Sequence, residues 1–158
     1  MNSEEDQKDS IVVTDTSCFI LLEKINALYV LHELFKTVLT TPEIANEYGR
    51  PLPERVIITP ANNHSLQQQF AQYVDAGEAS AIALAAEINC DYVILGDIAA
   101  RKLAVRLGLP VKGTVGVLLY AKQNGIIPML RPYIELVQQT NFRLSQQLAD
   151  QFILDAGE

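Results

Sequence analysis

Four carboxylates stand out in this sequence because each lies where a strand should end or in a short helix. Asp15 and Asp97 each follow a short apolar run, while Glu47 and Glu78 lie in helical segments. In parallel α/β folds, functional side chains gather at one edge of the sheet, outside the carboxyl ends of the strands. Acids far apart in the chain would therefore meet in one oxygen-rich pocket, and oxygen ligands are what a hard divalent cation prefers.

Each of these acids also has a purely structural interpretation. Asp15 and Asp97 would cap the helices that follow them, and Glu78 would complement the dipole of its helix. Two uncompensated carboxylates at neighbouring strand exits repel unless a cation or a proton lies between them, which favours a metal site. Glu47 falls on the flank of the inward face of its helix, whereas Glu43, in the first turn, is better explained by the helix dipole.

Two hydroxyls complete the candidate site as accessory residues. Ser17 and Thr114 lie beside the exits of the first and fifth expected strands, where each would cap a helix or hold a metal-bound water or a phosphate oxygen. His32 and His64 share no metal-ligand spacing with each other or with a cysteine, which argues against zinc. The sequence has no G-x-G-x-x-G, Walker or G-x-S-x-G motif, so the common nucleotide-binding and hydrolase interpretations are excluded.

Short apolar strands that alternate with helices must position these residues. The strands are expected at Ile11–Thr14, Val38–Thr40, Val56–Ile58, Tyr92–Leu95 and Leu109–Lys112. They are apolar without alternation, as is typical of strands covered on both faces. The pattern predicts a three-layer α/β/α fold with a central parallel sheet in the order 3-2-1-4-5. In that order the first and fourth strands are neighbours, and their exits share a crevice.

Helical patterns fill the segments between the strands. An alanine-rich helix is expected over Glu78–Asn89, and Thr41-Pro42 indicates an N-cap followed by proline in the first turn of another helix. A helix before Glu78 is expected to bury one stripe, formed by Leu66, Phe70, Tyr73 and Val74. The final helix is expected to pack on the domain or to exchange with a partner subunit, through Leu144, Leu148 and Phe152.

The composition indicates one domain over residues 11–158, after a loose acidic tail over residues 1–10. A chain of 158 residues, 49% of them apolar, can bury a core without disulfides. Cys18 and Cys90 lie in apolar patterns and are expected to be reduced core thiols. No apolar stretch approaches the roughly 20 residues that cross a bilayer. No basic-then-apolar leader opens the sequence, so cytoplasmic residence without a membrane partner is expected.

The net charge of −7 argues, by itself, against a nucleic-acid-binding protein, but the charge is unevenly distributed. No Asp or Glu occurs from Ile98 to Ile134, and half of the twelve basic residues fall there. The candidate nucleic-acid-binding residues in this segment are Arg101, Lys102, Arg106, Lys112 and Lys122. Phosphate attraction is local, screened over about 10 Å, so the segment is expected either to contact nucleic acid or to be a solvated helix surface.

Taken in order, these motifs resemble those of the PIN-domain nucleases. The matching segments are Thr14-Asp15-Thr16-Ser17 with Phe19-Ile20, Pro42-x4-Glu47, Gly77-Glu78-Ala79 and Leu95-Gly96-Asp97. Within these nucleases, the chain is similar to a poorly characterised prokaryotic branch related to VapC-type toxins. That branch also carries sequences like Gly113-Thr114-Val115 and Phe142-Arg143-Leu144-Ser145. The resemblance extends from about Ile11 to the last residue.

This resemblance implies a metal-dependent ribonuclease that hydrolyses RNA phosphodiester bonds. Asp15, Glu47, Glu78 and Asp97 would form the catalytic cluster, in which Asp15, Asp97 and Glu78 would bind one or two Mg²⁺ or Mn²⁺ ions. Relatives often have two adjacent acids where this chain has Gly96-Asp97, so the number of metal ions stays open. The implied partners are an RNA substrate, a small antitoxin-like protein if the chain is a toxin, and a second copy in a homodimer.

Two other classes of function stay open at this point. One is a catalytically silent PIN-like module that binds nucleic acid or protein and in which the acids serve only as caps. The other is an aspartate-based phosphatase or receiver domain, which is disfavoured because no D-x-D follows the first strand and no lysine follows a late strand in the required place. Titration with Mn²⁺ separates the silent module from the nuclease, because only clustered carboxylates would bind the ion and gain thermal stability.

Overall fold

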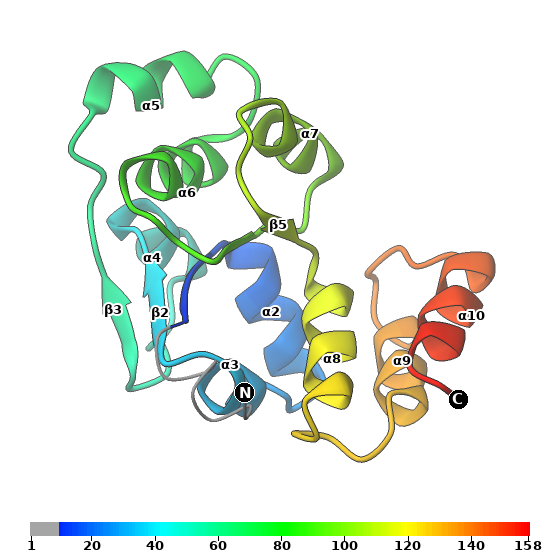
Figure 1. Cartoon of the computed structure of the whole chain (residues 1–158). Helices are drawn as coiled ribbons and strands as arrows, with labels where there is room; N and C mark the ends of the chain where they lie inside the picture. The colour runs from blue at the N-terminus through cyan, green and yellow to red at the C-terminus, as the bar shows by residue number, and fades with distance from the viewer. Residues whose placement is uncertain (1–9) are drawn as a thin grey trace.

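The parallel sheet expected from the sequence forms the centre of the computed structural model, which describes residues 10–158 (Figure 1). All four pairs of neighbouring strands are parallel, in the order β3-β2-β1-β4-β5. The strands are β1 (Ile11–Thr14), β2 (Thr37–Thr40), β3 (Val56–Ile58), β4 (Tyr92–Ile94) and β5 (Val111–Lys112). The predicted fold class and strand order are therefore confirmed.

Helices cover both faces of this sheet. They are α2 (Thr16–Lys24), α3 (Tyr29–Leu34), α4 (Pro42–Tyr48), α5 (His64–Phe70), α6 (Ala76–Glu87), α7 (Ile98–Arg106), α8 (Thr114–Gln123), α9 (Arg131–Gln138) and α10 (Gln146–Asp155). Helix α6 packs against β1 and β4, with α5 and α7 beside it, while α2, α3 and α8 pack together on the other side (Figure 1). Helices α9 and α10 lie outside α8, so the chain ends away from the sheet.

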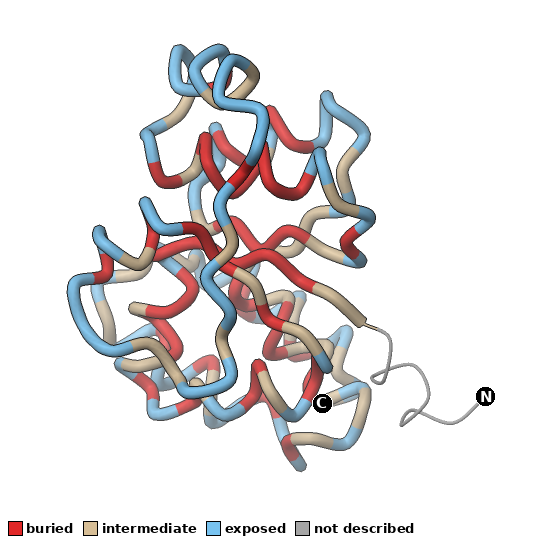
Figure 2. Tube along the Cα trace, turned by 90° about the vertical axis from the view of Figure 1, so that its left-hand side faces the viewer, coloured by how far each residue is buried: buried red, intermediate tan, exposed pale blue. Residues whose placement is uncertain are grey.

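The core follows the central strands on both faces of the sheet (Figure 2). Val12, Val13 and Val93 are fully buried, as the unbroken apolar character of β1 and β4 predicts. The edge strand β3 is different, because Ile57 and Ile58 are about half exposed. The expectation that every strand is covered on both faces is therefore wrong for β3, which has a neighbouring strand on one side only.

Local sequence signals fix several helix ends, among them the predicted start of α4. Thr41 caps α4 by accepting a hydrogen bond from the Ile44 N–H, and Pro42 occupies the first turn. After α7, Gly108 adopts a φ of +76°, a left-handed conformation that few other residues adopt without strain. These ends determine where the chain turns back toward the sheet.

The predicted stripe of the helix before α6 is wrong at Tyr73. Helix α5 ends at Phe70, and the backbone then turns before it enters α6. Phe70 is buried as expected, but Tyr73 lies beyond the helix and is 64% exposed. A helical spacing of apolar residues has no meaning past the residue at which the helix ends.

The buried face of the last helix agrees with the prediction only in part. Leu144 and Phe152 are partly buried and pack against the core, but Leu148 is about half exposed. Helix α10 packs mainly through Ala149 and Ile153, because the small side chain of Ala149 allows a close approach to the neighbouring helices.

The predicted N-terminal tail, residues 1–10, falls outside the described residues except for Ser10. The Ser10 carbonyl accepts a hydrogen bond from the Thr37 N–H at 3.0 Å, which continues the pairing of β1 with β2. Cys18 and Cys90 are both buried and free. Within the part of the chain that the structure describes, no helix has the length and apolar character required to span a membrane.

Candidate functional site

Asp15 lies at the centre of the candidate site, immediately after β1. Its side chain is buried, and its two oxygens accept hydrogen bonds from the Cys18 N–H at 2.9 Å and from the Gly96 N–H at 2.8 Å. The bond to Cys18 caps α2, and the bond to Gly96 joins the exit of β1 to that of β4. Because Gly96 precedes Asp97 in the chain, the structure brings these two acids to the same part of the sheet edge.

Gly96 allows this close approach because it has no side chain. A Cβ atom at Gly96 would lie 2.5 Å from the Cβ atom of Ser17, too near for any real pair of carbon atoms. Ser17 is exposed in the first turn of α2 and lies against the exit of β4. The accessory serine is therefore next to the acids, and Asp97 continues the chain as the N-cap of α7, accepting from the Ala100 N–H at 3.0 Å.

Glu78 reaches the same edge of the sheet from the start of α6. It forms a capping box with Asp75: the Glu78 N–H donates to Asp75 Oδ1 at 2.8 Å, and the Asp75 N–H donates to Glu78 Oε2 at 3.3 Å. Asp75 is thus a fifth acid near the site, and sequence reasoning missed it. The signal that could have found it is the spacing Asp75-Ala-Gly-Glu78, since an N-cap residue followed three positions later by Glu is typical of a capping box.

Glu47 approaches the cluster from the last turn of α4. A Cβ atom at Gly77 would lie 2.5 Å from Glu47 Oε2, so this carboxylate lies directly over the backbone at the start of α6. Its negative charge is among the causes that raise the pKa of Asp15. Glu47 is therefore placed at the exposed rim of the cluster.

The acids of the cluster lie close enough to raise one another's pKa values, and no basic side chain pairs with them within residues 10–158. Burial raises the pKa of Asp15 from 3.8 to about 6, with further increases from Asp75 and Glu47, although the backbone N–H donors of Gly96 and Cys18 oppose this. Burial likewise raises the pKa of Glu78 from 4.5 to about 7, helped by Asp75, Asp97 and Asp15. The ion pairs within residues 10–158 join other groups, so no basic side chain neutralises these acids directly.

In metal-free buffer, we expect the free energy of unfolding to increase as the pH falls from 8 to 5. The folded-state pKa values of Asp15 and Glu78 lie above those of exposed carboxyls, so the folded state binds protons that the unfolded state does not. The stabilisation is complete near pH 4 and is lost as the pH rises through 6 to 7. For buried Asp15, the increase from 3.8 to about 6 corresponds to about 3 kcal/mol. Urea unfolding at a series of pH values measures this free energy. In Glu78→Gln, the dependence on pH near pH 7 should become weaker. A free energy of unfolding that decreases as the pH falls from 8 to 5 would contradict the prediction.

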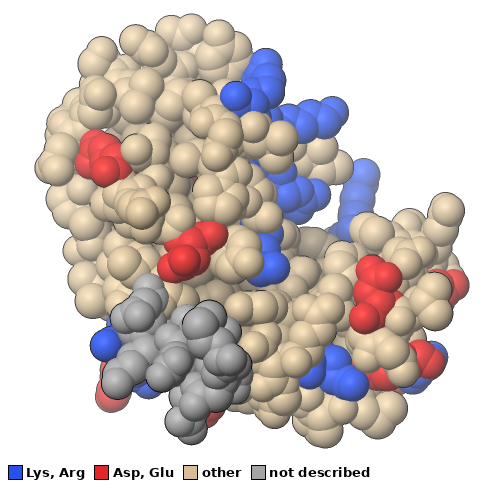
Figure 3. All heavy atoms as spheres, in the orientation of Figure 1, with Lys and Arg blue, Asp and Glu red and all other residues tan. Residues whose placement is uncertain are grey.

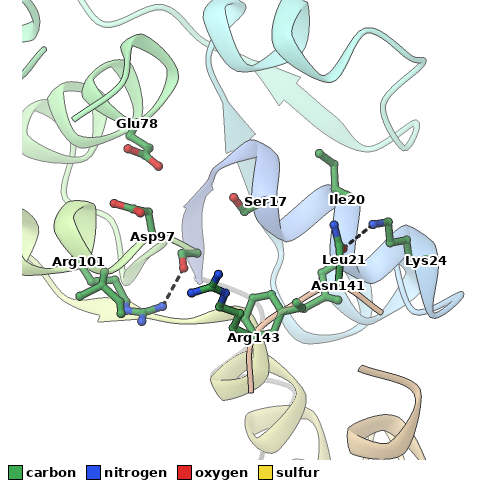
Figure 4. Close-up of a pocket in the computed structure, with 12 residues that line it drawn as sticks. Ser17, Ile20, Leu21, Lys24, Glu78, Asp97, Arg101, Asn141 and Arg143 are labelled. Carbon is green, nitrogen blue, oxygen red and sulfur yellow. Dashed lines mark hydrogen bonds between the residues drawn. The ribbon is translucent and has the colours of Figure 1, made fainter. Parts of the chain in front are cut away.

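A cavity of about 520 Å³ opens in front of the acids (Figure 4). Glu78 and Asp97 face one another on one side of it, and Ser17 lies across from them. Its basic lining residues are Lys24, Arg101 and Arg143. The cavity therefore combines acids that can bind a cation with cations that can bind an anion.

Of the five predicted basic residues, only Arg101 lines this cavity, where its Nη1 donates to the carbonyls of Leu95 and Gly96, each at 3.2 Å. Lys102 and Arg106 line a neighbouring cavity, and Figure 3 shows Lys and Arg atoms gathered around α7.

The other two predicted basic residues are held in packing contacts. The Lys112 ammonium lies over the rings of Tyr92 and Tyr120, and burial lowers its pKa. Lys122 contacts the C-terminal Ala156 and Glu158. Their positions give no support to a role in nucleic-acid binding.

Sequence reasoning missed three residues that come together beside the acids. Lys24, at the end of α2, donates to Asn141 Oδ1 at 2.9 Å, and this bond ties the loop after α9 to α2. Two residues further along that loop, Arg143 lines the cavity. No local pattern marks these residues, because a loop has no periodicity and the contact depends on how α9 packs.

Thr114, the second accessory residue, does not line the cavity. It is 1% exposed in the first turn of α8, and its hydroxyl has no oxygen or nitrogen partner among residues 10–158. The nearby polar group is the Cys18 thiol, whose pKa is raised by burial to about 12. Thr114 belongs to the packing beneath Asp15.

The donor atoms at this edge suit a divalent cation, although they do not form a closed coordination shell. Within residues 10–158, no three His, Cys, Asp or Glu side chains are already arranged to hold an ion. An ionised carboxylate can accept about four hydrogen bonds or ligand contacts, so Asp15 keeps capacity beyond its two backbone bonds. Asp15, Glu78 and Asp97 are the residues that would bind the ion.

The five parallel strands, with helices on both faces, form a three-layer α/β/α domain in which Asp15 and Asp97 follow β1 and β4. A family described as PIN domain matches residues 11–158, so the chain belongs to the PIN-domain family, whose members are typically nucleases that use divalent metals. The predicted family is confirmed, while the relation to VapC-type toxins stays a prediction. No curated protein matches this chain.

Proposed function

We propose that this protein is a metal-dependent ribonuclease that hydrolyses phosphodiester bonds in RNA. One observation carries the proposal: the carboxylates of Glu78 and Asp97 line a cavity that Arg101 and Arg143 also line, and the buried carboxylate of Asp15 lies just behind its wall, where it accepts a hydrogen bond from the Gly96 N–H. The acids suit a divalent cation, and the arginines suit the phosphates on either side of a cut. Membership of the PIN-domain family supports the same chemistry.

The three acids differ in how firmly they are held, and this assigns them different roles. Asp15 is fixed by two backbone donors and is the rigid anchor of the ion site. Asp97 uses one oxygen to cap α7, which leaves its other oxygen for a ligand. Glu78 makes only a long 3.3 Å bond to Asp75, and without a metal its pKa is raised by burial to about 7, so near neutral pH the ion would compete with a proton for this carboxylate. A bound Mg²⁺ or Mn²⁺ would lower the pKa of a water molecule and stabilise charge on the leaving oxygen.

The residues around these three acids would bind and orient the substrate. Arg143 and Ser17 face the cavity and would contact the scissile phosphate, while Glu47 would support the cluster from its rim. Arg101 donates to the carbonyls at the exit of β4 and so holds the backbone that carries Asp97.

A catalytically silent PIN-like binding module is the second candidate. It is favoured by the fact that Asp15 and Asp97 each cap a helix and Glu78 belongs to a capping box, so each acid has a structural role without any metal. Under either candidate, an antitoxin-like partner and a homodimer are proposals that co-purification and light scattering of the purified protein would test.

Titration with Mn²⁺ separates the two candidates. For a ribonuclease site, we expect the melting temperature at pH 7.5 to rise with Mn²⁺ concentration, because an ion that binds only the folded state adds about 2.7 kcal/mol at a hundred times its Kd. The Glu47→Gln variant should show a weaker effect, and Glu43→Gln, which changes an exposed acid on the same helix, should behave like the unmodified protein. A melting temperature that does not respond to millimolar Mn²⁺ would favour the silent module.

A further inference from the structure

A second cavity, of about 810 Å³, lies beside the acidic one. Ile98 and Arg101, in the first turn of α7, line both cavities. The two cavities therefore share that turn as a common wall, and the second cavity borders the one that the acids line.

The chemistry of this second cavity differs from that of the acidic site. Its surface is apolar and exposed: Tyr73, Ile98 and Val105 are 64%, 62% and 64% accessible to solvent. Lys102 and Arg106 also line it, and none of its lining residues is acidic. Within residues 10–158, the Tyr73 ring stacks on no other aromatic ring.

We propose that the second cavity binds an unpaired nucleobase of single-stranded RNA, stacked on the ring of Tyr73, while Lys102 and Arg106 contact the adjacent phosphates. Exposed aromatic rings beside basic residues bind single strands in this way, because every base presents a flat apolar face. In a duplex both faces of each base are already stacked, so duplex RNA cannot use this cavity. The proposal rests on the proposed function and deepens it, since it adds a base-binding subsite beside the acids.

Charge favours RNA over a protein as the occupant. The protein carries a net charge of −7. The residues that line the second cavity nevertheless include three basic side chains and no acidic one, namely Arg101, Lys102 and Arg106. Because electrostatic attraction is screened over about 10 Å, the net charge contributed by acids elsewhere on the surface does not cancel these three cations for a polyanion bound in this cavity. Because Ile98 and Arg101 line both cavities, one strand bound at the acids has the second cavity beside it.

Binding measured without cleavage tests the proposal. Fluorescence anisotropy of a labelled twelve-nucleotide RNA, in buffer containing EDTA, should show binding of the single strand that the matched duplex does not reproduce. Tyr73→Leu should weaken single-strand binding on the order of tenfold, while Tyr73→Phe, which keeps the ring, should bind as the unmodified protein does. Lys102→Gln and Arg106→Gln should each reduce the salt slope by about 0.7, and Lys36→Gln, at an exposed residue before β2, should leave it unchanged.

Hydrolysis of bis(p-nitrophenyl) phosphate, a diester without a base, separates a failure of this inference from a failure of the proposed function. Tyr73→Leu should hydrolyse this compound at the unmodified rate but cleave single-stranded RNA more slowly at limiting RNA concentrations. If RNA is cleaved and Tyr73→Leu binds and cleaves it normally, the inference is overturned while the ribonuclease stands. If neither compound is cleaved but single-strand binding depends on Tyr73, the inference stands without the nuclease. If Tyr73→Leu changes only the monomer–dimer equilibrium, this face is an interface between two copies and the inference fails.

Discussion

Asp97→Asn is expected to reduce metal-dependent cleavage of RNA on the order of a thousandfold while the fold persists. Asparagine is as good an N-cap as aspartate, and its amide oxygen can accept the Ala100 N–H that Asp97 Oδ2 accepts now. The substitution therefore preserves the start of α7 and removes only the negative charge. If the acids hold the catalytic ion, that charge is what the reaction requires.

Single-turnover cleavage of a labelled single-stranded RNA in Mg²⁺ measures this effect, with the far-ultraviolet circular dichroism and melting temperature as measures of folding. Glu135→Gln is the matched control, because it removes one exposed acid from α9, outside the site. Cleavage by Asp97→Asn at the rate of the control protein would remove Asp97 from the mechanism and, with it, the central part of the proposed ion site.

Asp15→Asn would be a less informative variant, for a reason that only the structure reveals. Both Asp15 oxygens accept backbone N–H donors, from Cys18 and from Gly96. An asparagine has one amide oxygen, so its NH₂ group would face one of these donors without an acceptor, and an unsatisfied buried donor costs about 1–3 kcal/mol. Judged from the sequence alone, Asp15→Asn removes a charge at constant volume. Because of these two hydrogen bonds, the substitution should also lower the stability of the fold.

The sheet was predictable because its signals are local and mutually consistent. Short apolar runs, each followed by a helix start, give parallel strands, and the preference for right-handed crossovers restricts their order. The hydrogen bond between Gly96, which precedes Asp97, and the Asp15 carboxylate is consistent with that order, since β1 and β4 are adjacent and their exits must be neighbours. Capping residues such as Thr41 were predictable for the same reason, because a cap acts within one turn of its helix.

The rest of the site depends on contacts that no local pattern encodes. The apolar spacing that assigned Tyr73 to the core assumes a continuous helix, and the end of α5 at Phe70 instead exposes this ring beside α7. Arg143 lies in a loop whose position is set by the packing of α9 and by the hydrogen bond between Lys24 and Asn141. The sequence predicts which acids meet but not which cations face them, because the cations arrive on elements placed by tertiary packing.

Arg143→Gln is expected to slow RNA cleavage on the order of a hundredfold, mainly in kcat. Arg143 lines the cavity that the acids face, and Figure 4 shows its side chain pointing into the space near Ser17 and Asp97. Within residues 10–158 it makes no ion pair, so its charge is free for a phosphate. Negative charge increases at the phosphate as the bond breaks, and a guanidinium in contact with it stabilises that change more than it stabilises the bound substrate.

The loop that carries Arg143 should tolerate the substitution, because this side chain is exposed. Two other hydrogen bonds hold the loop: Lys24 donates to Asn141, and the Phe142 N–H donates to Thr140 Oγ1 at 3.1 Å. Arg131→Gln, at an exposed arginine on α9, is the matched control for the loss of one positive charge. Steady-state cleavage over a range of RNA concentrations distinguishes a change in kcat from one in KM. An equal loss in Arg131→Gln would show that the effect is one of overall charge, and normal cleavage by Arg143→Gln would exclude Arg143 from contact with the scissile phosphate.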